Sequence, residues 1–198
     1  MRIEVLNPRL EGYRYVLASR SPRRKYLLEQ LGLPFSVEVQ DTNESFPDYL
    51  TAPKSAIYLA EKKAAAFPSR EIASKTIVIT ADTIVAREGH ILGKPASAEE
   101  AVAMLRMLSG GSHEVITGVH LKSNQRKAHF GVSTKVFFKT LSDKEIEYYV
   151  SNHRPFDKAG AYGIQEWIGL ATIRRIEGSY FNVVGLPVHE LYEQLLKW

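Results

Sequence analysis

The stretch Leu17-Ala-Ser-Arg-Ser-Pro-Arg-Arg-Lys-Tyr-Leu27 decides how the chain begins to fold. It starts within an apolar run, residues 15–18, which is typical of a buried strand. Ser21 is a favourable helix N-cap residue, and Pro22 suits the first helical turn, where its missing N–H costs no hydrogen bond. The stretch therefore predicts a strand, a short polar loop and a helix over residues 22–31.

Two arginines at the start of that helix favour an anionic ligand. Arg23 and Arg24 add positive charge to a helix N-terminus, which already carries a partial positive charge and unpaired N–H groups. Phosphate would compensate this charge, because helix N-termini bind it through backbone N–H groups and arginine binds it with a planar fork of donors. A solvated basic turn after a Ser-Pro cap is the alternative that these residues alone leave open.

The remaining hydrophobic pattern predicts a mixed α/β fold. Strands and helices alternate in the first half of the chain, and a hairpin follows later. Strands are expected near 35–39, 76–81, 113–121, 130–138 and 171–177, helices near 53–67, 98–108, 143–150 and 187–197, and a Gly-rich loop over 155–169.

Composition limits the class of protein. The 198 residues are 44% hydrophobic and 24% charged, as in ordinary globular proteins, and neither a membrane-length apolar run nor a signal-peptide core at the start is found. The absence of Cys excludes disulfide and thiolate chemistry and suits a cytoplasmic setting. The net charge of +4 and the pI of about 9.2 are compatible with a nucleic acid or with a small phosphate-rich ligand.

An acidic residue follows the apolar run 76–81. Asp82 is expected at the C-terminal end of that strand, where open α/β sheets place their ligands, and Thr83 adds a hydroxyl beside it. The alternative is an aspartate that opens a turn before the next apolar residues, 84–85.

Two further stretches have unusual compositions. Gly93-Lys94-Pro95 holds a lysine between a flexible and a rigid residue, but it is not a Walker A loop, and a plain turn is the simpler interpretation. Residues 156–165 combine Asp157, a lysine, two glycines, an aromatic residue and Gln165, whose amide could read the edge of a base. A Gly-rich loop with a capping aspartate is the alternative.

Weaker candidates lie elsewhere. Glu44 is in a polar loop and Lys63 on a helix whose exposed face should be charged, so each alone is more simply interpreted as a solvated surface residue. The six histidines show no zinc-type spacing, and no G-x-S-x-G nucleophile motif occurs.

Taken together and in order, seven motifs resemble the Maf family of nucleoside triphosphate pyrophosphatases. They span nearly the whole chain, and their order is more specific than any one of them. The motifs are Leu17-Ala-Ser-x-Ser-Pro-Arg-Arg24, Leu59-Ala-x-x-Lys63-Ala64, Ala81-Asp-Thr83, Leu92-Gly-Lys-Pro95, Thr117-Gly-Val119, Asp157-Lys-Ala-Gly-Ala-Tyr162 and Glu177-Gly-Ser…Asn182-Val-Val-Gly-Leu-Pro187.

The resemblance implies an activity and a fold. The activity is hydrolysis between the α- and β-phosphates of a nucleoside triphosphate, which gives the monophosphate and pyrophosphate and removes unwanted nucleotides from the pool. The fold is a single α/β domain over residues 1–198, with two lobes around an elongated, curved mixed sheet flanked by helices, similar to the Maf and inosine-triphosphate-pyrophosphatase-like fold. The active site is expected in the cleft between the lobes, and the protein is expected to be a homodimer without a membrane partner.

The resemblance also implies roles for individual residues. Asp82 matches the proton acceptor proposed for the family. A divalent cation, Mg²⁺ or Mn²⁺, is expected on the carboxylates of Glu44, Asp82 and Asp157, since such cations prefer carboxylate, water and phosphate oxygens. Residues suited to holding the triphosphate are Ser19, Ser21, Arg23, Arg24, Lys63 and Lys94.

Three positions separate the subgroups of this family. In the subgroup that prefers dTTP and UTP, an Arg follows Ser-Pro, a Thr or Ser follows the catalytic Asp, and a Gln ends the Gly-rich loop. Arg23, Thr83 and Gln165 match all three, whereas the subgroup similar to 7-methyl-GTP pyrophosphatases has Trp, Gln and Glu there. The resemblance therefore implies dTTP and UTP as substrates and leaves modified pyrimidine nucleotides open.

The chain departs from the family pattern twice. Arg20 stands where a small residue is commoner, which adds charge near the expected phosphates. After Gln165, residues 166–169 read Glu-Trp-Ile-Gly in place of a Gly-rich continuation, which changes the expected base pocket.

Two other functions compete with hydrolysis. The family was named for effects on septum formation in cell division, which would make the chain a regulatory binding protein, and this role can coexist with an enzymatic one. A nucleic-acid binder rests on the pI alone, because the chain lacks the basic stripe interleaved with aromatic residues that strand binding usually shows.

Overall fold

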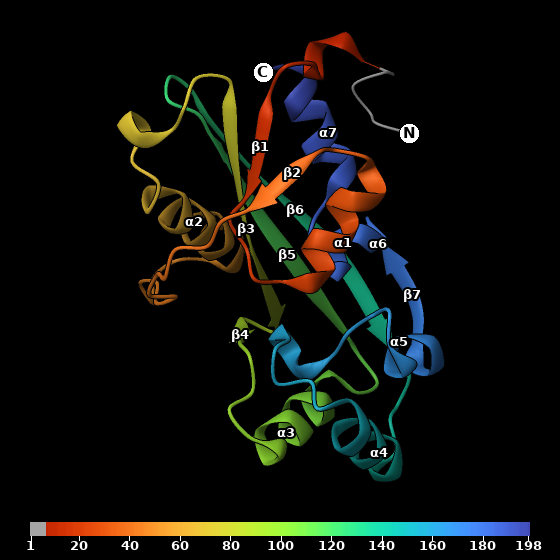
Figure 1. Ribbon diagram of the computed structural model, residues 1–198. Coiled ribbons are helices and arrows are strands. Elements are labelled where there is room, and N and C mark those ends of the chain that lie inside the picture. Colours follow the sequence, from red (N-terminus) through yellow and green to blue (C-terminus); the bar gives the residue numbers. More distant parts are fainter. Residues whose placement is uncertain (1–6) are drawn as a thin grey trace. The chain divides into compact units, whose positions relative to one another are not determined.

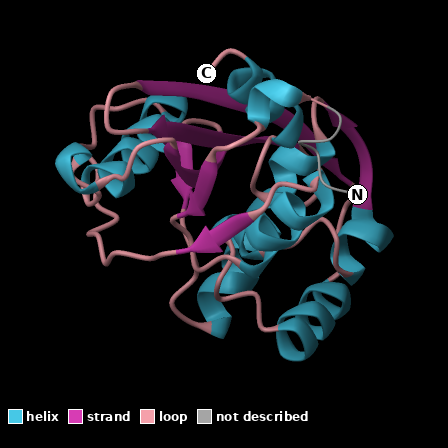
Figure 2. Ribbon diagram, turned by 45° about the horizontal axis from the view of Figure 1, so that its top comes forward, coloured by secondary structure: helices cyan, strands magenta, loops and turns pink. Residues whose placement is uncertain are grey.

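The computed structural model describes residues 7–198 and confirms the mixed α/β class (Figures 1 and 2). The start of the chain, where no signal-peptide core is expected, lies outside the described residues. The strands are β1 (Arg14–Leu17), β2 (Phe35–Val37), β3 (Thr76–Arg87), β4 (His90–Leu92), β5 (Ser112–Lys122), β6 (Lys127–Phe138) and β7 (Ile173–Glu177). The helices are α1 (Pro22–Leu31), α2 (Ala52–Ala65), α3 (Ala98–Leu108), α4 (Asp143–His153), α5 (Trp167–Thr172), α6 (Tyr180–Val184) and α7 (Val188–Leu196).

One mixed sheet joins the strands of the described part of the chain. Its order is β2-β1-β3-β5-β6-β7, and β4 pairs with β3. β1 runs parallel to β2 and β3, with Leu17 opposite Val37 and Ile79, whereas β4 is antiparallel to β3 and β7 is antiparallel to β6. The sheet is therefore parallel around β1 and antiparallel at these later pairs.

The chain divides into two compact units. The first comprises Met1–Asp82, Thr117–Val132 and Gly185–Trp198, and the second comprises Thr83–Ile116 and Ser133–Val184. None of the helices within residues 7–198 has the length and hydrophobicity of a transmembrane span.

The start of the first unit follows local sequence rules. The Ser21 Oγ accepts a hydrogen bond from the Arg24 N–H (3.4 Å), and Gly32 ends α1 in the left-handed conformation (φ 76°). The Ala18 N–H donates to the Ile79 carbonyl (2.9 Å), so the loop between β1 and α1 lies beside β3 (Figure 1). The predicted strand, loop and helix are confirmed.

Helix α2 lies against the sheet at a glycine. A Cβ added at Gly118 of β5 would lie 2.4 Å from the carbonyl carbon and oxygen of Ala56, which is fully buried in α2. One turn later, the Ala60 carbonyl accepts a hydrogen bond from the Thr80 Oγ1 of β3 (2.7 Å). Small residues on both sides thus let the helix backbone touch the strands that carry the candidate site.

We expect Gly118→Ala to destabilise the protein by about 1–3 kcal/mol, because the added methyl group meets backbone atoms that cannot rotate away. A change of 1 kcal/mol corresponds to roughly 2–4 °C in melting temperature for a protein of this size. Gly93→Ala is the control, since a Cβ there meets nothing within 4 Å. Equal melting temperatures for the two variants would contradict the close contact.

Strand β3 corrects one expectation. Asp82 lies inside the strand and not at its end, because the buried residues Ile84 and Val85 continue the apolar run and Val85 pairs with Leu92 of β4. The interpretation of Asp82 as the opening of a turn is therefore wrong as well.

Other boundaries differ in smaller ways. Two short helices were not expected: α5 shortens the Gly-rich loop, and α6 follows β7. Ser142 and Glu145 form a capping box at the start of α4, whereas the Glu100 carboxylate near the start of α3 accepts from the Ala96 N–H (2.7 Å). β2 ends at Val37, two residues early.

Candidate active site

The loop before α1 forms a compact polar group in the first unit. The Ser21 N–H donates to the Ser19 Oγ (3.2 Å), and the Arg24 guanidinium also donates to this oxygen through Nη1 (3.4 Å). The Arg24 Nε donates to the carbonyl of Gly185 (2.8 Å). Both serines thus help to set the N-terminus of α1, the place where an anion is expected.

Arg24 is more enclosed than the sequence indicates. It is buried, and this burial lowers the pKa of its guanidinium, whereas the negative charge of Asp82 raises that pKa. Sequence reasoning missed Gly185, whose carbonyl anchors Arg24 and whose φ of 126° favours glycine. The available signal was the position of Gly185 in the Asn182–Pro187 motif.

A lysine joins two carboxylates in the same unit. The Lys63 Nζ lies 2.9 Å from Glu44 Oε1 and also contacts Asp82 Oδ1. The side chains of Lys63 and Asp82 are 17% and 14% exposed, while that of Glu44 is 49% exposed. The structure therefore brings together three predicted site residues, two of which looked like surface residues when considered singly.

The polar group at the start of α1 and the group around Lys63 interact electrostatically. Asp82 and Glu44 both influence the pKa of Arg24 electrostatically, which places the carboxylates near the start of α1. The cause lies in the sheet, because β1 and β3 are parallel neighbours and Leu17 is opposite Ile79. The residues that follow Leu17 in β1 and Ile79 in β3 therefore lie side by side.

The other arginines of the loop are more accessible. Arg23 is half-buried in the first turn of α1. Arg20 is exposed and forms an ion pair with the exposed Asp41 (2.7 Å). A surface pair of this kind contributes little to stability, so Arg20 can turn to another anion at small cost.

The second unit holds the remaining predicted site residues. The Gly160 N–H donates to the Gly93 carbonyl (3.0 Å), so the turn that carries Lys94 lies against the Gly-rich loop. Gly160 has a φ of 69°, and a Cβ there would lie 3.0 Å from the Val85 side chain, which explains the glycine. Gln165 is exposed, and Thr83 is half-buried on β3.

The three carboxylates expected to bind a metal are divided between the units. Glu44 and Asp82 meet in the first unit, whereas Asp157 belongs to the second, where its carboxylate accepts from the Lys158 Nζ (2.6 Å). Within residues 7–198, no group of three or more His, Cys, Asp or Glu side chains is arranged to hold a metal ion. The three-carboxylate set stays a prediction.

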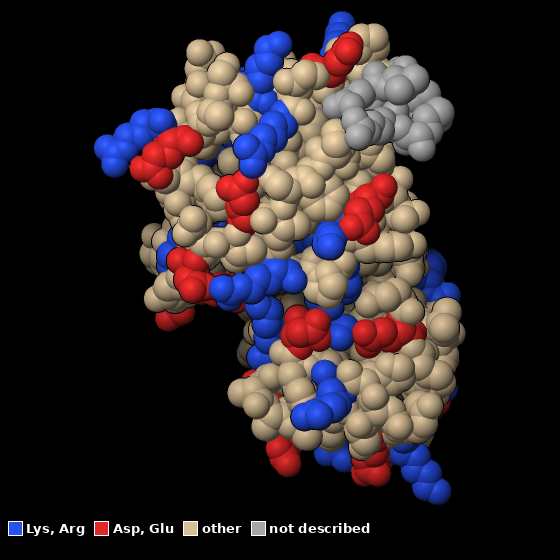
Figure 3. Space-filling view, viewed as in Figure 1, with Lys and Arg blue, Asp and Glu red and all other residues tan. Residues whose placement is uncertain are grey.

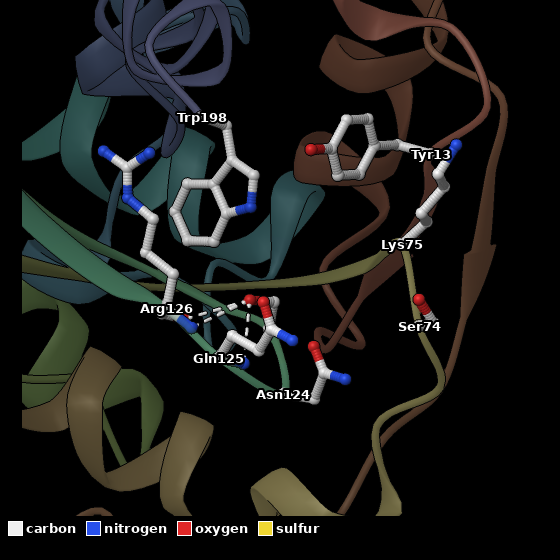
Figure 4. A pocket seen from close by; sticks show the side chains of 8 residues that line it. Tyr13, Ser74, Lys75, Asn124, Gln125, Arg126 and Trp198 are labelled. Atoms are coloured by element: carbon white, nitrogen blue, oxygen red, sulfur yellow. Dashed lines mark hydrogen bonds between the residues drawn. The ribbon is translucent and has the colours of Figure 1, made fainter.

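A separate pocket of about 240 Å³ contains none of these residues (Figure 4). Trp198 and Tyr13 face it from different segments of the first unit, and the Arg126 guanidinium lies 5.0 Å from the Trp198 ring centroid. Among the described residues that line this pocket there is no Asp or Glu side chain, so it lacks the acidic side chains that the expected hydrolysis needs.

Residues 14–198 match the family described as Maf-like protein. A Bacteroides fragilis protein named dTTP/UTP pyrophosphatase is 49% identical over 187 residues, which cover 94% of this chain and 96% of the relative. A Porphyromonas gingivalis protein of the same name is 50% identical over 188 residues, 94% of either chain. Among solved structures, the Staphylococcus aureus Ham1 protein has a TM-score of 0.42 and 15% identity over 63% of this chain and 71% of that one.

Proposed function

The chain belongs to the Maf-like family, and from this we propose that it is an enzyme that hydrolyses dTTP and UTP to the monophosphate and pyrophosphate. Relatives that share about half of its residues carry the name dTTP/UTP pyrophosphatase. The observation that supports the proposal lies in the first unit: the negative charges of Asp82 and Glu44 raise the pKa of Arg24 at a helix start suited to an anion, and Lys63 contacts both carboxylates. Turnover of a nucleotide panel, with pyrophosphate and phosphate assayed separately, tests it.

The triphosphate is assigned to the start of α1. The Arg23 guanidinium offers donors and positive charge to phosphate oxygens, and the partial positive charge of the helix N-terminus adds to the attraction. Arg24, already held by the Gly185 carbonyl and Ser19, is preorganised and loses little side-chain freedom when a phosphate binds. Lys94 is assigned to the same polyphosphate, where its charge offsets that of the leaving pyrophosphate.

Asp82 is assigned the role of general base. In the proposed step, a water oxygen forms a bond to phosphorus, the bond to the oxygen that bridges the α- and β-phosphates breaks, and the water proton passes to the Asp82 carboxylate. The electron pair of the broken bond leaves with pyrophosphate. Lys63 orients Asp82 through their direct contact, so the carboxylate does not have to reorganise when the water is deprotonated.

The donor set fits a divalent cation. The Lys63 ammonium contacts oxygens of both Glu44 and Asp82, which supports a position where the two carboxylates share one positive charge. Glu44 and Asp82 would hold Mg²⁺ or Mn²⁺, and water and phosphate oxygens would complete a coordination shell of the kind that Mg²⁺ prefers. Such a cation supplies positive charge that polarises phosphate oxygens and favours deprotonation of water.

We expect Lys63→Met to lower the melting temperature of the protein when divalent cations are absent. We also expect Mg²⁺ to raise the melting temperature of this variant more than that of the wild type. Without the ammonium, two carboxylates face each other, at a cost of about 2 kcal/mol, the scale of a hydrogen bond to a charged group. Melting temperatures with EDTA and with Mg²⁺ measure both effects. Lys62→Met is the control, because the Lys62 Nζ donates to the Ser45 carbonyl (2.9 Å) in the same loop. An equal Mg²⁺ response in the two variants would count against the shared cation position.

Base recognition is assigned to Gln165 with Arg23 and Thr83. Uracil and thymine present two carbonyl acceptors around one N3–H donor. The amide of Gln165 has both a donor and an acceptor, so it can pair with N3–H and one carbonyl, while Arg23 or Thr83 donates to the other. Cytosine reverses part of this pattern and would leave a polar group unpaired.

The charge distribution favours a small anionic ligand over a nucleic acid. Figure 3 shows Lys and Arg side chains together with Asp and Glu side chains on the face in view. A strand of nucleic acid usually needs a groove of one sign combined with stacked aromatic residues. The homodimer and the cytoplasmic setting stay predictions from the sequence.

A further inference from the structure

Three side chains behind the Gly-rich loop form one hydrogen-bonded group. The Glu166 carboxylate accepts from the Tyr149 hydroxyl through Oε2 and from the Lys158 Nζ through Oε1 (3.0 Å). We call Tyr149, Lys158 and Glu166 the loop clamp. Tyr149 comes from α4, Lys158 from the start of the loop and Glu166 from its end, so the clamp ties both ends of the loop to a helix.

Two of the three side chains of the loop clamp are buried, so their polar groups need partners within the protein. Tyr149 is fully buried and Lys158 is 8% exposed. An ammonium group at this depth requires charged or strongly polar partners, and Lys158 has the carboxylates of Glu166 and Asp157 (2.6 Å). Burial and the Glu166 carboxylate raise the pKa of Tyr149, so its hydroxyl keeps the proton that it donates.

The clamp reaches Gln165 from both sides. Glu166 is the next residue along the chain, and its backbone N–H donates to the Gly163 carbonyl (3.0 Å). The Gly163 N–H in turn donates to the Tyr149 hydroxyl (3.0 Å). A Cβ at Gly163 would lie 2.9 Å from both Gln165 Nε2 and Glu166 Cδ, so the two side chains lie over this glycine.

Helix α5 fixes the same turn from the other direction. A Cβ at Gly169 would lie only 1.8 Å from the Ile164 carbonyl oxygen, which means that the first turn of α5 touches the loop backbone just before Gln165. Glu166 is the N-cap residue of α5. The segment Glu166–Gly169, which departs from the family pattern, thus replaces flexible glycines with a helix packed on the loop.

We propose that Glu166, held by Tyr149 and Lys158, is a positioning residue that sets the Gln165 amide and thereby the choice of base. The inference rests on the proposed function of the chain as a dTTP and UTP pyrophosphatase. Gln165 itself is exposed, so its side chain keeps rotamer freedom. A mobile backbone at this residue would add further orientations of the amide. A fixed backbone lets the amide present its donor and acceptor to a base at a lower entropic cost.

The test compares two substitutions in the clamp with one outside it. Tyr149→Phe keeps the ring, which stacks on His153, and removes only the hydroxyl, while Glu166→Gln keeps the size and removes the charge. Glu145→Gln is the matched control, because it breaks a comparable lysine pair (Lys139 Nζ, 2.5 Å) on the same helix α4 without touching the loop.

Two ratios are measured for each protein: kcat/KM for dTTP over dGTP, and the affinity for dTMP over dGMP by calorimetry. We expect both ratios to fall by about fivefold in each clamp variant, the effect of one lost hydrogen bond, with a smaller change in kcat for dTTP. Glu145→Gln should lower the melting temperature and leave both ratios unchanged. The monophosphate affinities report on base recognition without turnover.

The outcomes separate the inference from the function on which it rests. A wild-type protein that hydrolyses neither dTTP nor UTP to pyrophosphate would overturn the proposed function, and the inference with it. If the wild-type protein is selective and both clamp variants keep its dTTP/dGTP and dTMP/dGMP ratios, the inference alone is overturned. If Tyr149→Phe does not fold, Glu166→Gln decides, since it leaves the Tyr149 hydroxyl and its bond from Gly163 in place.

Discussion

Replacing Asp82 by Asn is expected to lower turnover of dTTP by at least about 10²-fold, the usual scale for losing a general base. The amide has nearly the same shape as the carboxylate but cannot accept the proton of the attacking water. Asp82 lies inside β3, between strand residues that stay unchanged, so the variant should fold. Steady-state kinetics with pyrophosphate detection measure the effect, and circular dichroism establishes the fold.

The control for this substitution is Asp41→Asn. Asp41 is exposed and pairs only with the exposed Arg20 among the ion pairs described, so its loss should leave turnover close to that of the wild type. A folded Asp82→Asn variant with near-wild-type turnover would remove the base role from Asp82. Glu44 or Asp157 would then be the next carboxylate to test.

The second large effect concerns the base. We expect dTTP and UTP to exceed purine triphosphates and unmodified CTP by at least about tenfold in kcat/KM, because an unpaired polar group costs about 1–3 kcal/mol. Gln165→Glu should weaken this preference, since a carboxylate loses the amide donor and repels the carbonyls of uracil and thymine. Kinetics with dTTP, UTP, CTP, ATP and GTP measure the profile before and after the substitution.

Gln125→Glu is the matched control for this change. It introduces the same charge at an exposed position of the first unit, beside the separate aromatic pocket, and should leave the profile unchanged. Equal rates on dTTP and GTP in the wild type, or an unaltered profile in Gln165→Glu, would exclude Gln165 as the selecting residue.

Local interactions explain which parts of the fold the sequence predicts well. Ser21, Pro22 and Gly32 act within a few residues of themselves, and the bounds of α1 follow from them. The length of β3 was not predictable in this way, because its continuation depends on pairing with β4, where Val85 meets Leu92. Short α5 and α6 have too few turns for a helical pattern to show.

The candidate site shows the same limit. The sequence identifies Asp82, Lys63 and Glu44 as residue types suited to the chemistry, but only the folded chain places one ammonium between the two carboxylates. The contact of Arg24 with Gly185 joins residues 161 positions apart, which no local pattern reveals. The loop clamp likewise depends on Tyr149, which lies on a helix that the sequence offers no reason to connect with Gln165.

The central claim is hydrolysis of the α–β phosphoanhydride, and the most direct measurement identifies the first products of dTTP and UTP. The purified protein is incubated with each nucleotide and Mg²⁺ or Mn²⁺, and monophosphate, diphosphate, pyrophosphate and orthophosphate are quantified separately. The account predicts one pyrophosphate and one monophosphate for each triphosphate consumed. Orthophosphate with dTDP or UDP as the primary products would contradict it.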